Sequence, residues 1–298
     1  MDQSTPHRTE ASPSEPTPTE PTPTGAHATR GTGWAMPVIT LLGVAAAIVA
    51  AFVGSGALGG TPVAESAGGA LSADATPVAP AGSAFGIWSV IYLGLVGYAL
   101  WQLTATARRS ARQRALRPWA LASVLLNAAW IWTVQLDQIA ASVLVIAVLL
   151  GVLVRIMYLL GAPRTGGVVE LVVTDGTFGL YLGWVSVATL ANTFAWLAAE
   201  GVDPVTGVPL GLVGIVAAAG IGVATAVLSR GRVAPALATA WGLAWVAVGR
   251  TEGRFESGAL VWTAAVASAV VLVVAVVNWL RVRRATPPRQ DANLPGRS

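Results

Sequence analysis

The sequence contains eight long apolar runs. The length of each is similar to that of a helix that crosses the hydrocarbon core of a bilayer, about 20 residues. A peptide group in hydrocarbon has no water to bind, so such runs form helices, whose backbone hydrogen bonds are internal. The sequence therefore predicts an all-α integral membrane protein of about eight transmembrane helices, in contact with the lipid bilayer. The predicted spans cover residues 35–57, 84–106, 118–136, 138–160, 177–199, 208–229, 233–250 and 258–281.

The composition fits this class of protein. Hydrophobic residues make up 54% of the chain and charged residues 11%, against about 25% charged residues in soluble domains. Residues 1–33, by contrast, are rich in Pro, Thr, Ser and Glu. Because such a segment buries too little apolar surface to fold, we expect a disordered polar N-terminal tail. We also expect a disordered C-terminal tail over residues 285–298.

Several kinds of chemistry are excluded by residue types that the membrane part lacks. The chain has no cysteine and no lysine, and its two histidines, His7 and His27, lie in the N-terminal tail. This excludes thiol nucleophiles, disulfides, lysine Schiff bases and histidine or thiolate metal ligands from the membrane part. We therefore expect no catalytic residue, no metal site and no bound cofactor, and the sequence does not favour an enzyme.

The charged residues alternate from one predicted loop to the next. Since basic residues collect on the cytoplasmic side of a membrane protein, the pattern predicts a multi-pass cell-membrane protein with both termini cytoplasmic. We attribute the high pI of 10.3 to this topology and to anionic lipid headgroups, and expect no nucleic-acid partner. Arginine-rich connections contain Arg108, Arg109, Arg112, Arg114, Arg117, Arg164, Arg230, Arg232, Arg281, Arg283 and Arg284, whereas the alternate ones contain Glu65, Asp74, Asp137, Glu200 and Asp203, with only Arg250 and Arg254 out of place.

Aromatic and polar residues recur at helical spacing in three of the predicted helices. Residues three or four apart share one helix face, and an asparagine inside a membrane is costly unless it pairs, which favours the interior of the bundle. Two alternatives stay open: the asparagines can serve as interhelical hydrogen bonds, and the tryptophans can belong to an interfacial aromatic belt. The candidate ligand-binding residues are Trp88, Tyr92, Asn127, Trp130, Trp184, Ala188 and Asn192.

Three short motifs on these helices resemble those of one family. Residues 85–92 (FGIWSVIY) are similar to an FGPVWTxLY segment, and residues 126–130 (LNAAW) to an LNxxW motif. Residues 184–192 (WVSVATLAN), followed by Trp196, are similar to a signature of a tryptophan, small residues, an asparagine and a second tryptophan. In this order they resemble the tryptophan-rich sensory protein (TspO, translocator protein) family over residues 35–199.

The resemblance implies a fold and a kind of ligand. It implies a five-helix bundle over residues 34–200, with a pocket closed by the loop between the first two helices, and leaves residues 201–284 as three additional helices. Members bind porphyrins and other flat apolar ligands, in some cases sterols. The family's pocket tryptophans correspond to Trp88 and Trp184, and its small and polar positions to Ala188, Asn192 and Asn127.

The sequence also departs from the family pattern. Residues 80–84 (PAGSA) lack the second proline and the tryptophan that usually precede the first motif, and Leu180 replaces a proline. Nothing like the family's sterol-recognition segment follows Trp196. These differences argue against a sterol, and the ligand that the resemblance implies is then a porphyrin or other tetrapyrrole.

The leading functional hypothesis is a ligand-binding membrane sensor or regulator. A small-molecule transporter is an alternative, because there are eight predicted helices and a faint similarity between residues 117–130 and 232–245, which is either an internal repeat or a chance match in a sequence rich in Ala, Val and Leu. A structural membrane scaffold is the second alternative. Light-dependent breakdown of a bound porphyrin is disfavoured because the membrane part offers no catalytic base. The sequence leaves a homodimer open.

Overall fold

A computed structural model describes residues 33–54, 61–63, 65–161 and 164–285. These residues form helices joined by turns, and no β-strand occurs among them. The two predicted disordered tails fall, apart from Gly33 and Ala285, outside the described residues. The prediction of an all-α protein is therefore confirmed for the part of the chain that the structure covers.

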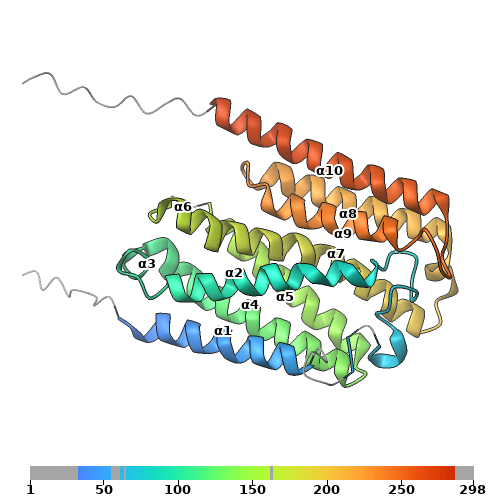
Figure 1. Cartoon of the computed structure of the whole chain (residues 1–298), viewed down its shortest axis with the longest axis horizontal. Coiled ribbons are helices and arrows are strands. Elements are labelled where there is room, and N and C mark those ends of the chain that lie inside the picture. The colour runs from blue at the N-terminus through green and yellow to red at the C-terminus, as the bar shows by residue number, and fades with distance from the viewer. Residues whose placement is uncertain (1–32, 55–60, 64, 162–163, 286–298) are drawn as a thin grey trace, which may run out of the picture. The chain divides into compact units, whose positions relative to one another are not determined.

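Eight long helices run along one another in this part of the chain (Figure 1). Each overlaps one of the predicted spans, although α4 begins seven residues before its span. The third and fourth are joined by a tight turn at Asp137, whose backbone has a φ of 58°. The long helices are α1 (Ala35–Gly54), α2 (Ile87–Trp101), α4 (Ala111–Gln135), α5 (Ile139–Leu159), α7 (Thr177–Ala199), α8 (Val208–Leu228), α9 (Ala234–Val248) and α10 (Gly258–Ala285). The short segments are η1 (Ala67–Gly69), η2 (Gly82–Gly86), α3 (Ala105–Arg109), α6 (Gly167–Glu170), η3 (Leu171–Gly176) and η4 (Asp203–Thr206).

Six helical segments of the described chain are long and apolar enough to cross a membrane. The remaining long helices are α4, which begins with an arginine-rich stretch, and α9, which has 15 residues. At 1.5 Å per residue α9 extends about 22 Å, less than the roughly 30 Å of a hydrocarbon core. The protein is a multi-pass helical membrane protein, and these two helices are the least typical of its predicted spans.

The helix predicted over residues 177–199 begins ten residues earlier than the sequence indicated. The short α6 and the π-helical η3 continue directly into α7, so that Gly167–Ala199 is one helical segment. Glu170 and Asp175, which sequence analysis left in a connection, therefore lie inside it. Their charges interrupted the apolar pattern, but each carboxylate is paired with arginine, which allows both to be buried.

Helix α7 lies between α2, α5 and α9 and joins the first five long helices to the last three. A Cβ atom placed on Gly183 would lie 2.0 Å from the carbonyl oxygen of Pro235, and one on Gly179 would lie 2.7 Å from Ala234 Cβ. These two glycines, four residues apart, therefore let α9 approach α7 closely. Contacts therefore continue across residue 200, where the sequence motifs end.

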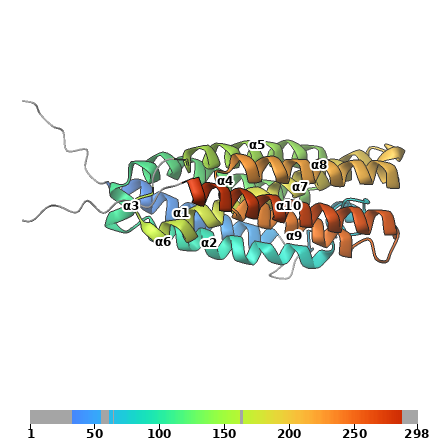
Figure 2. The ribbon, with the colours of Figure 1, turned by 90° about the horizontal axis from the view of Figure 1, so that it is seen from above.

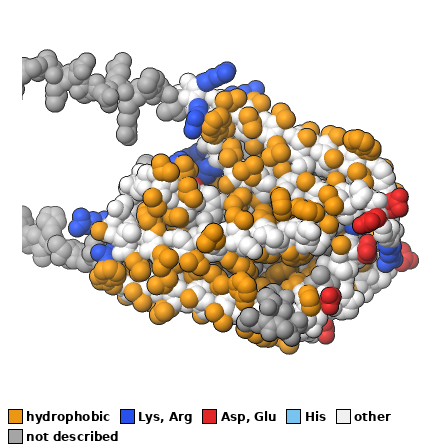
Figure 3. Space-filling model, viewed as in Figure 1, with side chains coloured by type: hydrophobic (Ala, Val, Ile, Leu, Met, Phe, Trp, Pro, Cys, Tyr) orange, Lys and Arg blue, Asp and Glu red, His pale blue; other side chains and the backbone are white. Residues whose placement is uncertain are grey.

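The two ends of the bundle differ in charge. Helix α1 begins and helix α10 ends at the same end of the bundle, as two perpendicular views show (Figures 1 and 2). Arginine side chains gather there, whereas acidic side chains gather at the opposite end, beside a few arginines (Figure 3). We call these the basic end (residues 102–110, 160–161, 164–166, 229–233 and 281–285) and the acidic end (residues 61–63, 65–86, 136–138, 200–207 and 249–257).

Candidate functional site

An aromatic cavity of about 340 Å³ lies near the acidic end of the bundle, between α1, α2 and α4. Its outer wall comes from the segment that connects α1 to α2, of which residues 61–63 and 65–86 are described; we call this the cap segment. The cavity walls are mostly apolar, which is typical of small-molecule sites. The lining residues are Phe52, Pro62, Val63, Gly82, Phe85, Trp88, Ser89, Tyr92, Trp130 and Ile131.

A smaller cavity of about 40 Å³ adjoins the first one, on the side of α7. Phe85 and Trp130 line both cavities and so form the wall between them. The remaining lining residues come from the cap segment and from α7: Ala70, Leu71, Thr76, Ala79, Pro80, Trp184, Ala188, Ala191, Asn192 and Ala195.

The two indoles that the motifs singled out converge at these cavities. The ring centroids of Trp88 and Trp184 lie 6.5 Å apart with the planes at 87°, an edge-to-face arrangement. Tyr92 stacks on Trp88 at 5.3 Å, and Phe85 meets Trp184 edge-on at 5.6 Å. Only 1% of Trp184 is exposed, so its ring faces the protein interior and not the acyl chains of the lipid.

The two asparagines are used differently. Asn192 connects three helices, because its Oδ1 accepts from Trp130 Nε1 at 3.3 Å while its Nδ2 donates to Ser142 Oγ at 2.9 Å. This matches the open alternative of an interhelical hydrogen bond. Asn127 donates to the hydroxyl oxygen of Tyr92 at 3.1 Å and so fixes the ring that stacks on Trp88.

Three buried polar atoms near the cavities have no hydrogen-bond partner among the described residues: Trp184 Nε1, a donor, Asn127 Oδ1, an acceptor, and the hydroxyl oxygen of Thr76. Leaving such a group unpaired costs about 1–3 kcal/mol. Trp184 lines the smaller cavity, so an acceptor atom of a ligand in that space could pair with its indole N–H. This donor is the most direct sign of a missing partner at the site.

Six of the seven candidate residues line the two cavities: Trp88, Tyr92 and Trp130 the larger, and Trp130, Trp184, Ala188 and Asn192 the smaller. Asn127 contributes through its hydrogen bond to Tyr92. The geometry thus brings the candidate residues together, while their role in binding stays a prediction. Among the described residues, no cluster of histidine or acidic side chains could hold a metal ion.

The residue that holds the cap segment lies outside the sequence motifs. Arg250, in the α9–α10 connection, is fully buried, and its Nη1 donates to the Thr76 carbonyl at 3.1 Å. Its Nη2 donates to the carbonyls of Ala73 and Ala79. Burial lowers the pKa of the Arg250 guanidinium, and the nearby Asp74 carboxylate opposes that effect. The charge pattern marked Arg250 and Arg254 as the two arginines out of place, but it did not indicate what Arg250 contacts.

Helix α9 holds the same segment by two further hydrogen bonds. The backbone N–H of Ala81 donates to the Trp245 carbonyl at 3.0 Å, and Trp241 Nε1 donates to the Ala84 carbonyl at 3.0 Å. The outer wall of the cavities is therefore positioned by the last three helices, outside the region that carries the motifs.

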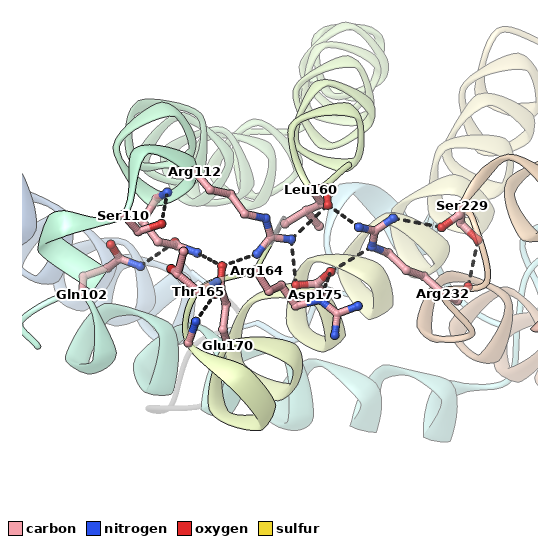
Figure 4. Close-up of polar contacts among 12 residues, drawn as sticks. Gln102, Ser110, Arg112, Leu160, Arg164, Thr165, Glu170, Asp175, Ser229 and Arg232 are labelled. Carbon is pink, nitrogen blue, oxygen red and sulfur yellow. Dashed lines mark hydrogen bonds and ion pairs between the residues drawn. The ribbon is translucent and has the colours of Figure 1, made fainter. Parts of the chain in front are cut away.

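A second polar cluster is buried at the basic end (Figure 4). The guanidinium of Arg112 pairs with Glu170 and, at 2.8 Å, with Asp175. Glu170 is fully buried and also accepts from Gln113 Nε2 at 2.7 Å and from two backbone N–H groups, those of Thr165 and Gly166. Buried ion pairs are tolerated where the remaining hydrogen-bonding sites are also satisfied, as they are for Glu170.

The cluster continues to the turn between α8 and α9. Arg232 Nε donates to Asp175 Oδ1 at 2.9 Å, and the same guanidinium donates to the carbonyls of Leu160 and Ser229. Arg164 approaches Asp175 at 3.8 Å. The charge pattern assigned Arg112 and Arg232 to topology alone and gave no sign of their pairing, since their acidic partners lie 57 or more positions away along the chain.

The family described as TSPO-like protein matches residues 38–278, from α1 to α10. The match includes the motif-bearing region and extends through α8 and α9, which sequence motifs had not connected with it. Comparison with curated proteins and with solved structures gives no match.

Proposed function

The chain belongs to the TSPO-like protein family, and from this premise we propose that it is a membrane ligand-binding sensor or regulator whose aromatic cavities take a porphyrin or another flat apolar molecule. The observation that carries the proposal is the convergence of Trp88 and Trp184, from two helices, on adjoining cavities. The indole N–H of Trp184, buried at the smaller cavity without a partner among the described residues, further supports a ligand that carries an acceptor atom.

The chemistry of the walls supports a flat conjugated ligand. Indole and phenol rings stack on, or meet edge-on, other aromatic systems, and such pairs add about 0.5–1.5 kcal/mol beyond area burial. The larger cavity, at about 340 Å³, lies at the lower end of the roughly 300–1,000 Å³ of small-molecule sites. A ligand that displaces the Phe85 ring, which is only partly buried, joins the two cavities and reaches Trp184.

We propose that the basic end faces the cytoplasm, which would give cytoplasmic termini and place the aromatic cavities toward the other side of the cell membrane. The separation of arginines from acidic side chains along the bundle supports this orientation. In such a protein the ligand enters from the non-cytoplasmic half of the membrane, where the cap segment closes the cavity.

Titration with protoporphyrin tests the proposed function. Binding in the cavities should quench tryptophan fluorescence saturably, and Trp88→Phe combined with Trp184→Phe should weaken the affinity about tenfold, because two ring contacts are reduced. The matched control is Trp34→Phe with Trp262→Phe, since both indoles are more than half exposed on the outer surface. Quenching that never saturates, and that is the same in both double variants, would refute the proposal.

A further inference from the structure

A larger groove lies at the basic end, apart from the aromatic cavities. It has a volume of about 830 Å³ and is formed by α2, the η3–α7 segment, the turn between α8 and α9, and the last turns of α10. Its residues belong to both the first five and the last three long helices. Basic side chains gather at this end of the bundle (Figure 3).

One wall of the groove is apolar and faces outward. Val90 and Leu93 of α2 and Leu171 and Val172 of η3 line it, and between 40 and 74% of each is exposed. Gly97 adds no side chain to this wall. A Cβ at that position would lie 3.4 Å from Val173 Cγ1, which is an ordinary contact, so there is space for a side chain there. As these helices cross the membrane, the wall is a surface for an acyl chain and not for water.

The other part of the groove carries an excess of positive charge. Arg164, Arg230, Arg232 and Arg283 line it, against the single carboxylate of Asp175. Four positive charges and one negative charge leave an excess of three. Such an excess next to the bilayer attracts an anion.

Two of these arginines have no anionic partner among the described residues. The carboxylate of Asp175 is already paired with the guanidinium groups of Arg112 and Arg232 at 2.8 and 2.9 Å. Arg230 and Arg283 form no ion pair within the described part of the chain, and the Arg283 guanidinium lies 4.0 Å from the centre of the Trp279 ring. Their charges are therefore available to a ligand.

We propose that this groove binds one anionic phospholipid, with its phosphate at Arg230 and Arg283 and an acyl chain along the wall of α2 and η3. Basic pockets between transmembrane helices are known to accept anionic headgroups. A free phosphate would use the arginines but leave the apolar wall empty, so the combination of the two surfaces favours a lipid. The bound lipid would join the two groups of helices at this end.

The experiment measures how much phosphatidylglycerol, compared with phosphatidylcholine of the same acyl chains, remains on the purified full chain by native mass spectrometry. The intact protein should retain phosphatidylglycerol preferentially. Arg230→Gln with Arg283→Gln should reduce this preference about tenfold, as each arginine near an anionic headgroup contributes of the order of 1 kcal/mol. Thermal unfolding should change little, because neither side chain forms an ion pair within the described residues.

The matched control is Arg281→Gln with Arg284→Gln, which removes two charges from the same helix end at exposed positions outside the groove. Gly97→Leu tests the apolar wall, since it fills the groove without changing its charge, and it should also lower retention. Inorganic phosphate at millimolar concentration is added in a separate arm and should not displace the lipid.

Each alternative outcome overturns the proposal. Equal retention of the two lipids by the intact protein would mean that there is no anion selectivity. Equal losses in the groove and control double variants would assign the effect to general surface charge. Full displacement by phosphate, together with an unchanged Gly97→Leu variant, would identify the ligand as a free anion and not a lipid.

Discussion

Arg232 and Arg250 stand two residues outside the opposite ends of α9, and each donates hydrogen bonds to backbone carbonyls of the first part of the chain. Arg232 reaches the Leu160 carbonyl and the Asp175 carboxylate at the basic end. Arg250 reaches the carbonyls of the cap segment at the acidic end. The short helix α9 is thus fixed at both ends to the helices that carry the motifs.

The first prediction concerns the cap segment. Arg250→Gln should speed protoporphyrin release about tenfold and make the cap segment more sensitive to thermolysin, because three carbonyl contacts to the cap are lost while the helices that line the cavities stay unchanged. Stopped-flow fluorescence measures release, and timed digestion measures exposure of the cap. Arg254→Gln, at an exposed position of the same loop, is the control. Identical digestion of the two variants would show that Arg250 does not hold the cap.

The second prediction concerns the buried ionic cluster. Arg112→Met should lower the free energy of unfolding by about 3–5 kcal/mol, because it leaves the buried carboxylates of Glu170 and Asp175 with too little compensating charge. Combining it with Glu170→Gln and Asp175→Asn should restore part of that loss. Thermal unfolding in detergent provides the measurement, with the exposed Arg114→Met as control. An Arg112→Met variant as stable as this control would contradict the prediction.

The third prediction concerns the contact between α7 and α9. Gly183→Ala should lower the free energy of unfolding by about 1–3 kcal/mol, because its Cβ would lie 2.0 Å from a backbone oxygen that cannot rotate away. Gly220→Ala in α8 is the control, since no atom lies within 4 Å of a Cβ at that position. There the higher helix propensity of alanine should be neutral or slightly stabilising. Thermal shifts of opposite sign in the two variants would agree with the structure, and equal shifts would contradict it.

The fourth prediction concerns orientation, and the lack of native cysteine makes it simple to test. Thr106→Cys and Thr251→Cys place single thiols at exposed positions of the basic and acidic ends. In intact cells a membrane-impermeant maleimide should label the second variant and leave the first unlabelled until the membrane is opened. The reverse pattern would place both termini outside the cell.

The sequence predicted the helices because hydrocarbon permits little else for long apolar runs. It missed the early start of the α7 segment, because Glu170 and Asp175 were read as loop charges. Their burial depends on Arg112 and Arg232, and that pairing has no local sequence signal.

The candidate site, too, could be predicted only in part from the sequence. Helical spacing placed Trp88 with Tyr92, and Trp184 with Asn192, on shared faces, and the family motifs selected those faces from many similar ones. The sequence could not indicate that the faces meet, nor that the outer wall is held by Arg250, whose partners lie more than 170 positions away. Contacts to backbone carbonyls are especially hard to foresee, because every residue offers the same acceptor.

That choice of acceptor has a consequence for how the protein can vary. The three hydrogen bonds that Arg250 donates to the cap segment all end on main-chain oxygen atoms, so a side-chain substitution there leaves these acceptors in place. Residues of the cap segment that line the cavities can therefore vary, as the absence of the family's usual tryptophan before residue 85 illustrates. Arg250 keeps the same three carbonyl contacts when they do.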